Sequence, residues 1–416
     1  MARAPSRRSM QRSPREWALR GGLAVAALAL GYVSTTQTLA FAVGKSSAER
    51  AHRMAPGDGR IAAELAEQLA AGEADTAQRV RADRIARQAV ADEPLAAPAL
   101  TALALNAQLR GNTTQARRLF VHSDALSRRE LGTRLWLIED AVEREDIPGA
   151  LRHYDIALRT SRMAPEILFP VLSVAIADPV VARALTDSLV ARPPWGEAFI
   201  NYLPRSSAEP DVSAQFFRRL AKSGVSIPER AQTNVINALV GAGEIEDAWS
   251  YYASLRSGAA RERSRDPAFA AQIEAPSAFD WAPINSDTGI SASIQHSRDG
   301  GIFDFAVPST IGGAVLQQGQ FLPAGRYRLE GVSRGIEQPP GARPYWQLTC
   351  AGGREAGRVE LPNSADNDGR FAGEITVDAD CRFQTLRLVA RPSSMIGGVT
   401  GQIESVRLVM TTRQSR

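Results

Sequence analysis

The sequence is poor in the residues that most often carry chemistry at enzyme and metal sites. Its 416 residues include only two cysteines and four histidines, and 6% are aromatic. Two cysteines exclude a small fold held together by several disulfides. The sequence contains no H-E-x-x-H and no C-x-x-C motif, which removes the usual signatures of zinc proteases and thiol oxidoreductases. We therefore expect no catalytic residues, no hydrolase nucleophile elbow, no metal site and no cofactor.

Excess positive charge is missing from most of the chain. The formal net charge is +4, but the first 20 residues hold six arginines and one glutamate, leaving 43 basic and 44 acidic residues behind them. A near-neutral body does not attract a phosphate backbone, so we expect no nucleic-acid partner. Arginine outnumbers lysine 47 to 2, which is typical of a protein encoded by a GC-rich bacterial genome.

A long uncharged segment follows the arginine-rich tail. Residues 21–44 carry no charge, lie between Arg20 and Lys45, and open with an apolar run at 23–30. A helix of this length would be about 36 Å long, enough to cross a bilayer core of about 30 Å. The arginines favour a cytoplasmic position for residues 1–20. We therefore expect a single-pass protein of the bacterial inner membrane, with a cytoplasmic N-terminus and a periplasmic body.

A cleaved signal sequence is the alternative interpretation of the same segment. Ala40-Phe41-Ala42 has the small-x-small form of a processing site, and the polar stretch Ser34–Thr38 weakens the second half of a membrane span. Both alternatives place the rest of the chain outside the cytoplasm.

The remainder changes in composition near residue 277. Fifteen glycines lie in residues 1–276 and eighteen in the last 140, where helical periodicity gives way to short alternating runs. This change predicts a helical body followed by a β body. We expect a linker at 45–59, a helical repeat domain at 60–256, a second linker at 257–278, and a β-sandwich at 279–412. The charged run Arg261–Arg265 of the second linker is expected to be solvated.

The helical body has an internal repeat of 34 residues. Ala116 and Phe120 recur as Ala150 and Tyr154, and Ala82 lies one period earlier. A small residue lets two helices approach closely, and an aromatic one turn later packs on the same face. This pattern resembles the tetratricopeptide repeat family, which implies stacked helical hairpins forming an α-solenoid that binds a protein partner.

The β body consists of short alternating runs separated by Gly, Pro, Asn and Asp. The expected strands lie at 302–307, 315–322, 327–332, 345–350, 371–377, 383–390 and 403–410. About eight strands without a helix predict an antiparallel sandwich. Leu322-Pro-Ala-Gly-Arg-Tyr-Arg-Leu329 and Gly401-Gln-Ile-Glu-Ser-Val-Arg-Leu408 resemble strands of carbohydrate-binding jelly rolls, which implies a jelly-roll fold and a polysaccharide as a second partner.

Five residues of the β body are candidates for specific roles. Cys350 and Cys381 would pair in an oxidising compartment, and the alternative is two free buried thiols. On the strand at 345–350, Tyr345 should point outward beside Arg343 and contact a ligand. Trp281 could be either a ligand platform or a plug that seals the entrance to the domain.

The combination predicts a membrane-anchored periplasmic scaffold. Its repeats would bind a protein, and its jelly roll would bind a glycan or a protein, in exopolysaccharide or envelope assembly. A glycan-active enzyme with unrecognised carboxylates and a purely structural envelope protein are the alternatives.

Overall fold

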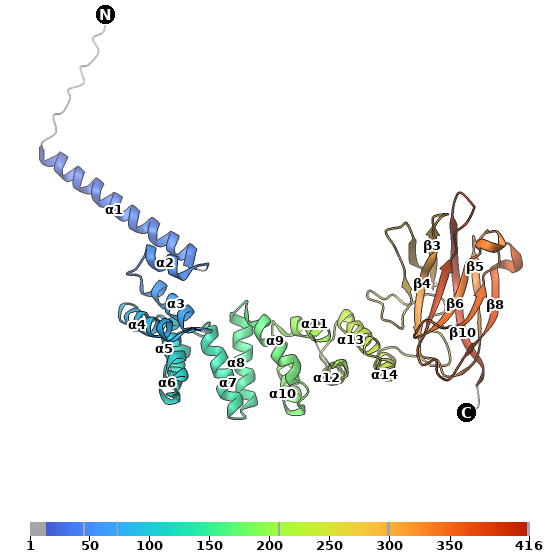
Figure 1. Ribbon diagram of the computed structural model, residues 1–416, viewed down its shortest axis with the longest axis horizontal. Coiled ribbons are helices and arrows are strands. Elements are labelled where there is room, and N and C mark those ends of the chain that lie inside the picture. The colour runs from blue at the N-terminus through green and yellow to red at the C-terminus, as the bar shows by residue number, and fades with distance from the viewer. Residues whose placement is uncertain (1–13, 45, 73, 207–208, 298–299, 414–416) are drawn as a thin grey trace, which may run out of the picture. The chain divides into compact units, whose positions relative to one another are not determined.

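The chain forms fourteen helices followed by two antiparallel sheets within the residues that the structure describes. The structure is a computed structural model that describes residues 14–44, 46–72, 74–206, 209–297 and 300–413. The chain divides into two compact units, Met1–Pro165 and Glu166–Arg416 (Figure 1). This order of elements confirms the predicted fold class of an α-helical region followed by a β-sandwich.

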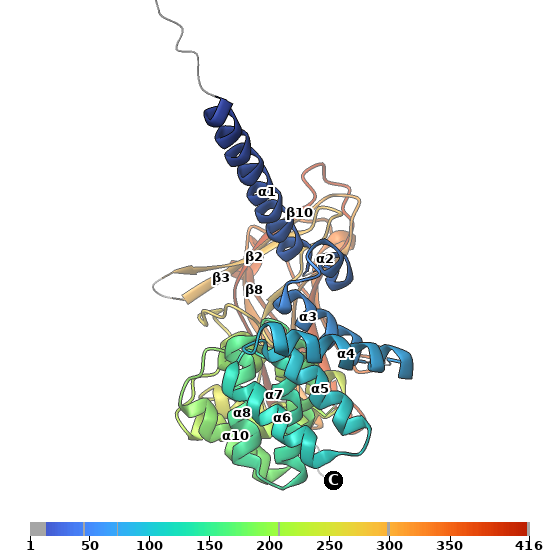
Figure 2. The same cartoon turned by 90° about the vertical axis from the view of Figure 1, so that its left-hand side faces the viewer.

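Helix α1 is the long apolar helix expected at the N-terminus. It runs from Pro14 to Gly44, and its segment Arg15–Gly44 is long and apolar enough to cross a membrane by length and composition, as a signal sequence would also be. Figure 2 shows it as one helix that extends away from α2 and α3. The helix begins inside the predicted cytoplasmic tail, of which residues 1–13 lie outside the described residues.

The C-terminal end of α1 belongs to the first folded cluster of the chain. Ala40 is fully buried and packs with Ala51, Ala55 and Ile61. Ala51 lies on α2, a short helix within the segment that we expected to be a linker. The helix forms because Ser47 accepts a hydrogen bond from the backbone N–H of the residue three positions on, and because Ala51 finds an apolar partner.

The helices of the first unit form antiparallel hairpins (Figure 1). Their bounds are α2 Ala48–Met54, α3 Gly59–Ala70, α4 Thr76–Asp92, α5 Ala97–Leu109, α6 Thr113–Leu126, α7 Leu131–Glu143 and α8 Ile147–Thr160. Helices α5 and α7 begin 34 residues apart, as do α6 and α8. The predicted repeat alanines Ala82, Ala116 and Ala150 are all buried. The 34-residue period is therefore a structural period.

Polar contacts also recur at this period. Asn106 of α5 and Arg110, which directly follows that helix, both donate hydrogen bonds to Asp83, and the Arg110 bond is 2.9 Å long. One period later, Arg117 stands at the position of Asp83 and Asp140 at the position of Asn106, and these two residues form an ion pair. The acidic residue therefore lies on the first helix of the pair in one repeat and on the second helix in the next. Each arrangement neutralises a buried carboxylate between neighbouring helices.

Six more helices open the second unit, which begins inside α9. Their bounds are α9 Ala164–Ala175, α10 Pro179–Val190, α11 Gly196–Ser206, α12 Pro210–Lys222, α13 Glu229–Gly241 and α14 Ile245–Leu255. The turn between α13 and α14 uses Gly243 at a φ of +81°. Ala248 and Tyr252 of α14 are buried, which agrees with their predicted places in a diverged repeat.

The β body is a sandwich of two five-stranded antiparallel sheets. The strands are β1 Ala282–Pro283, β2 Ser291–Ser297, β3 Gly300–Val307, β4 Gly313–Gln320, β5 Gly325–Arg334, β6 Tyr345–Cys350, β7 Glu355–Glu360, β8 Arg370–Val377, β9 Gln384–Ala390 and β10 Val399–Arg413. One sheet has the order β1-β4-β9-β6-β7 and the other β2-β3-β10-β5-β8. Strands β2 and β7, which the sequence did not predict, are mostly exposed edge strands with little apolar alternation.

The inner faces of the two sheets form one apolar core. Its large members include Phe303, Phe305, Tyr327 and Trp346, each at most 1% exposed. Cys350 and Cys381, the pair expected to form a disulfide, are joined by a disulfide with Cα atoms 5.3 Å apart. It closes a loop across one end of this core.

Candidate functional site

The segment between α14 and the sandwich is a structural joint. Arg265 is 9% exposed, and its guanidinium donates to the backbone carbonyl of Phe279 at 2.8 Å and to that of Gly319. The same guanidinium lies over the rings of Trp249 and Tyr252, at 5.1 and 5.6 Å from their centroids. The prediction that this charged run is solvated is therefore wrong for Arg265, because aromatic faces and carbonyls replace its hydration.

A buried acid completes this joint. Asp280 is 5% exposed and accepts hydrogen bonds from the hydroxyl of Tyr252, at 2.8 Å, and from Ser277. Burial and the neighbouring carboxylate of Asp280 raise the pKa of Tyr252, so this phenol stays a donor. Arg265, Tyr252 and Asp280 thus link the last helix to the sandwich through a desolvated network.

The rest of the segment pairs with strand β10. Ser264 exchanges hydrogen bonds with Leu408, and the backbone N–H groups of Val406 and Met410 donate to Pro267 and Glu262. Strand β3 pairs with β10 only from Val399 to Ile403, which leaves this stretch of β10 open on that side. The segment therefore extends the sheet instead of acting as a free linker.

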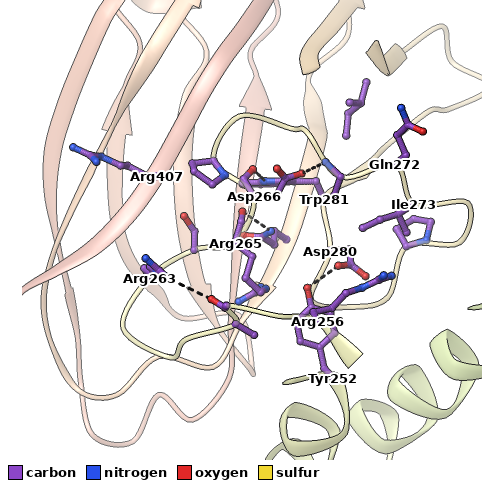
Figure 3. Close-up of a pocket in the computed structure, with 18 of the residues that line it drawn as sticks. Tyr252, Arg256, Arg263, Arg265, Asp266, Gln272, Ile273, Asp280, Trp281 and Arg407 are labelled. Carbon is purple, nitrogen blue, oxygen red and sulfur yellow. Dashed lines mark hydrogen bonds between the residues drawn. The ribbon is translucent and has the colours of Figure 1, made fainter. Parts of the chain in front are cut away.

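A cavity of about 940 Å³ lies between this segment, α14 and the sandwich (Figure 3). Arg256, Arg263, Arg407 and His296 line it, together with Trp281. The indole Nε1 of Trp281 donates to the backbone carbonyl of Asp266 at 3.0 Å, and Trp281 is 5% exposed. Its ring meets Trp346 of the core edge to face, at a centroid distance of 5.8 Å.

Trp281 therefore seals the edge of the sandwich core and presents little ring surface to the cavity. The charged groups of the cavity are mostly satisfied by the protein. Arg256 pairs with Glu229 at 2.6 Å, Arg407 pairs with Glu330, and Arg263 donates to a backbone carbonyl. The cavity walls thus offer neither a stacking platform nor an obvious orphaned charge.

Tyr345 lies on the opposite side of its strand from Trp346, on the outer face of the sheet β1-β4-β9-β6-β7. It is half-buried, as the outward orientation predicts. The guanidinium groups of Arg358 and Arg391 lie 4.2 and 4.6 Å from its ring centroid. These arginines pair with Glu355 and Glu360, respectively. The ring of Tyr345 is therefore already engaged with two cations.

Arg343 lies two residues before Tyr345, between the short helix at Pro340–Ala342 and β6, and is half-buried. Its buried Nε has no hydrogen-bond partner among the described residues. The structure does not bring Arg343 or Tyr345 to the cavity that Trp281 lines. The three predicted ligand residues thus belong to two separate regions of the sandwich.

One pentapeptide has the G-x-S-x-G spacing of a hydrolase nucleophile elbow. It is Gly331-Val-Ser-Arg-Gly335, with Ser333 inside strand β5 at 1% exposure. The Ser333 hydroxyl donates to the carbonyl of Gly369, at 3.2 Å. An elbow requires an exposed serine on a strand-to-helix turn, so this motif is a buried strand segment. Among the described residues, no group of three or more His, Cys, Asp or Glu side chains could hold a metal ion.

The most perturbed carboxyl pair lies in the first unit. Burial, followed by the nearby charge of Glu130, raises the pKa of Glu67 on α3 to about 9. Burial also raises the pKa of Glu130, which precedes α7. A shared proton is the simplest state of two desolvated carboxyls in contact. The sequence alone did not predict this pair, because the two glutamates are 63 residues apart.

No protein-family model and no curated protein matches the sequence. Among solved structures, PilF of Pseudomonas aeruginosa is 19% identical, with 49% of this chain and 96% of that chain covered at a TM-score of 0.27. A CBM4 structure is 16% identical, with coverages of 36% and 99% and a TM-score of 0.25.

The enzymatically active domain of tailspike protein 4 of bacteriophage CBA120 is 12% identical, at a TM-score of 0.26. The match covers 35% of this chain and spans about a fifth, 21%, of the tailspike chain. Similarities with TM-scores this low do not support an inference about function.

Proposed function

We propose that the protein is a non-catalytic, membrane-anchored scaffold of the bacterial envelope. Its helical repeats would bind a protein partner, and its sandwich would bind a polysaccharide, in exopolysaccharide or envelope assembly. The observation that carries this proposal is the desolvated joint of Arg265, Tyr252 and Asp280, which fixes the last hairpin to the sandwich. A joint of this kind holds two binding modules in one geometry, which is what a scaffold requires.

Two further features support an anchored position outside the cytoplasm. The exposed apolar surface of α1 suits a membrane, and the Cys350–Cys381 disulfide suits an oxidising compartment. Ala40 is buried in the first cluster of the folded chain, so processing after Ala42 would remove a core residue. We therefore favour the uncleaved anchor.

Crosslinking and co-purification of the full chain from membranes test the proposal. We expect a protein of polysaccharide assembly to be recovered with the chain. Arg265→Met should weaken complementation of a deletion strain because it loosens the joint, and Arg263→Met, an exposed neighbour in the same run, should not. Recovery of no assembly partner, equal complementation by both variants, or turnover of envelope glycans by the purified chain would each contradict the scaffold.

A further inference from the structure

The outer face of the sheet β1-β4-β9-β6-β7 carries a row of polar side chains in register. Gln317 of β4 is paired with Arg387 of β9, and Arg387 is paired with Gln347 of β6. All three are half-buried, while Leu386 and Leu388, which flank Arg387 on β9, are fully buried in the core. Strands lie about 4.8 Å apart, so the row spans about 10 Å across three strands.

Arg387, at the centre of this row, differs from the other arginines of the face. Arg358 and Arg391 each have a carboxylate partner and lie on the ring of Tyr345. Arg387 has no hydrogen-bond, ion-pair or ring partner within the part of the chain that the structure describes. A half-buried guanidinium without a counter-charge loses hydration and gains nothing from the protein in return. A ligand with a negative charge would supply the missing partner.

The neighbouring groups define the rest of that ligand. A guanidinium matches the geometry of a carboxylate through two parallel hydrogen bonds. The Gln317 amide on one side has no protein partner among the described residues, and amides both donate to and accept from hydroxyl groups. The Gln347 amide on the other side already donates to the carboxylate of Glu355. Gln317 and Arg387 are therefore the groups open to a ligand, and an extended chain bearing carboxylates and hydroxyls fits their alignment across the strands.

We infer that this face binds an acidic polysaccharide, with Arg387 receiving its carboxylate. The inference rests on the proposed glycan contact of the sandwich and specifies its ligand class. An acidic protein is disfavoured because protein interfaces are centred on apolar or aromatic anchors. The row offers none, and the nearest aromatic, Tyr345, already lies against Arg358 and Arg391.

Binding of the purified full chain to polygalacturonate tests this inference, with fully methyl-esterified polygalacturonate as the neutral counterpart of the same backbone. We expect the acidic polymer to bind at least tenfold more tightly than the ester. Arg387→Gln should remove this preference, and Arg387→Lys should restore part of it. Arg382→Gln changes an exposed arginine just before β9 and should leave the preference intact. Circular dichroism establishes that each variant is folded.

The outcomes separate this inference from the proposed function. Equal binding of the two polymers by the wild type, or an unchanged preference in a folded Arg387→Gln variant, overturns the acidic ligand and leaves the glycan contact standing. Binding of poly-glutamate as tightly as polygalacturonate assigns the face to acidic proteins and overturns the inference. Binding of no glycan overturns both it and the glycan part of the proposal, while co-purification tests the repeats separately.

Discussion

The helical cluster formed by α3, α4 and α5 and the core of the sandwich bury apolar surface with opposite kinds of side chain. In the cluster formed by α3, α4 and α5, every buried member is an alanine. The sandwich core instead contains two tryptophans and several phenylalanines. Alanine lets helices approach closely and spreads the stabilisation over many small contacts. Burial of one large side chain, in contrast, stabilises the fold by about 1.5–3 kcal/mol at a single position. The repeats should therefore be sensitive to added volume and the sandwich to removed volume.

Truncation in the sandwich should have the largest effect on stability. Trp346 is fully buried, and Trp346→Ala should destabilise the sandwich by about 3–5 kcal/mol because it leaves a cavity. Calorimetric unfolding of the full chain measures the shift. Val409→Ala on β10, where the side chain is 37% exposed, should change stability by less than about 0.5 kcal/mol. Similar shifts for the two variants would show that Trp346 does not hold the core together.

Loss of the disulfide should be the next largest effect. Cys350 and Cys381 are separated by 31 residues, and the chain-entropy model gives about 3–4 kcal/mol for a loop of this length. We expect the free energy of unfolding of the double Cys→Ser variant, measured by denaturant titration, to be lower than that of the wild type by that amount. Reduction of the wild type should reproduce the shift and leave the variant unchanged. A reductant effect on the variant would mean that the loss had another cause.

A larger side chain should destabilise the helical repeats more at a buried alanine than at an exposed one. Ala116 is fully buried between helices, and Ala116→Leu should cost about 1–3 kcal/mol through overpacking. Ala125→Leu places the same side chain at an exposed position of the same helix and should be nearly neutral. Helical unfolding followed by circular dichroism distinguishes them. If Ala116→Leu proved as stable as Ala125→Leu, the alanine positions would not be close-packed.

The two regions also differ in how far the sequence predicts them. The repeat was readable because Ala82, Ala116 and Ala150 recur at a fixed interval, and local spacing determines which side chains share a helix face. Most sandwich strands were readable from alternation. Strand β7 was not, because Glu355–Glu360 is an edge strand with a single buried side chain, Val359.

The joint and the outer face could not be predicted from the sequence, because both depend on contacts across long separations. Arg265 lies 54 residues from Gly319, whose carbonyl it binds, and a charged run favours solvent when taken alone. The row at Gln317, Arg387 and Gln347 arises from strand register, which no local pattern specifies. Tyr345 was predicted to point outward, whereas its covering by Arg358 and Arg391 was not.

The last predicted effect concerns a pair of carboxyl groups in the first unit, Glu67 and Glu130. Because the pKa of Glu67 is raised to about 9, folded Glu67 keeps its proton at pH values where the unfolded chain has lost it. The stabilisation contributed by Glu67 is therefore fully present below about pH 4.5 and is lost as the pH rises towards 9. Glu67→Gln should flatten this dependence, since an amide keeps a hydrogen bond to Glu130 without the ionisation. Thermal unfolding between pH 4.5 and 9 should show the variant matching the wild type at the acid end and exceeding it increasingly above. Glu139→Gln, on the exposed face of α7, should reproduce the wild-type profile, and a flattened profile there would locate the pH dependence elsewhere.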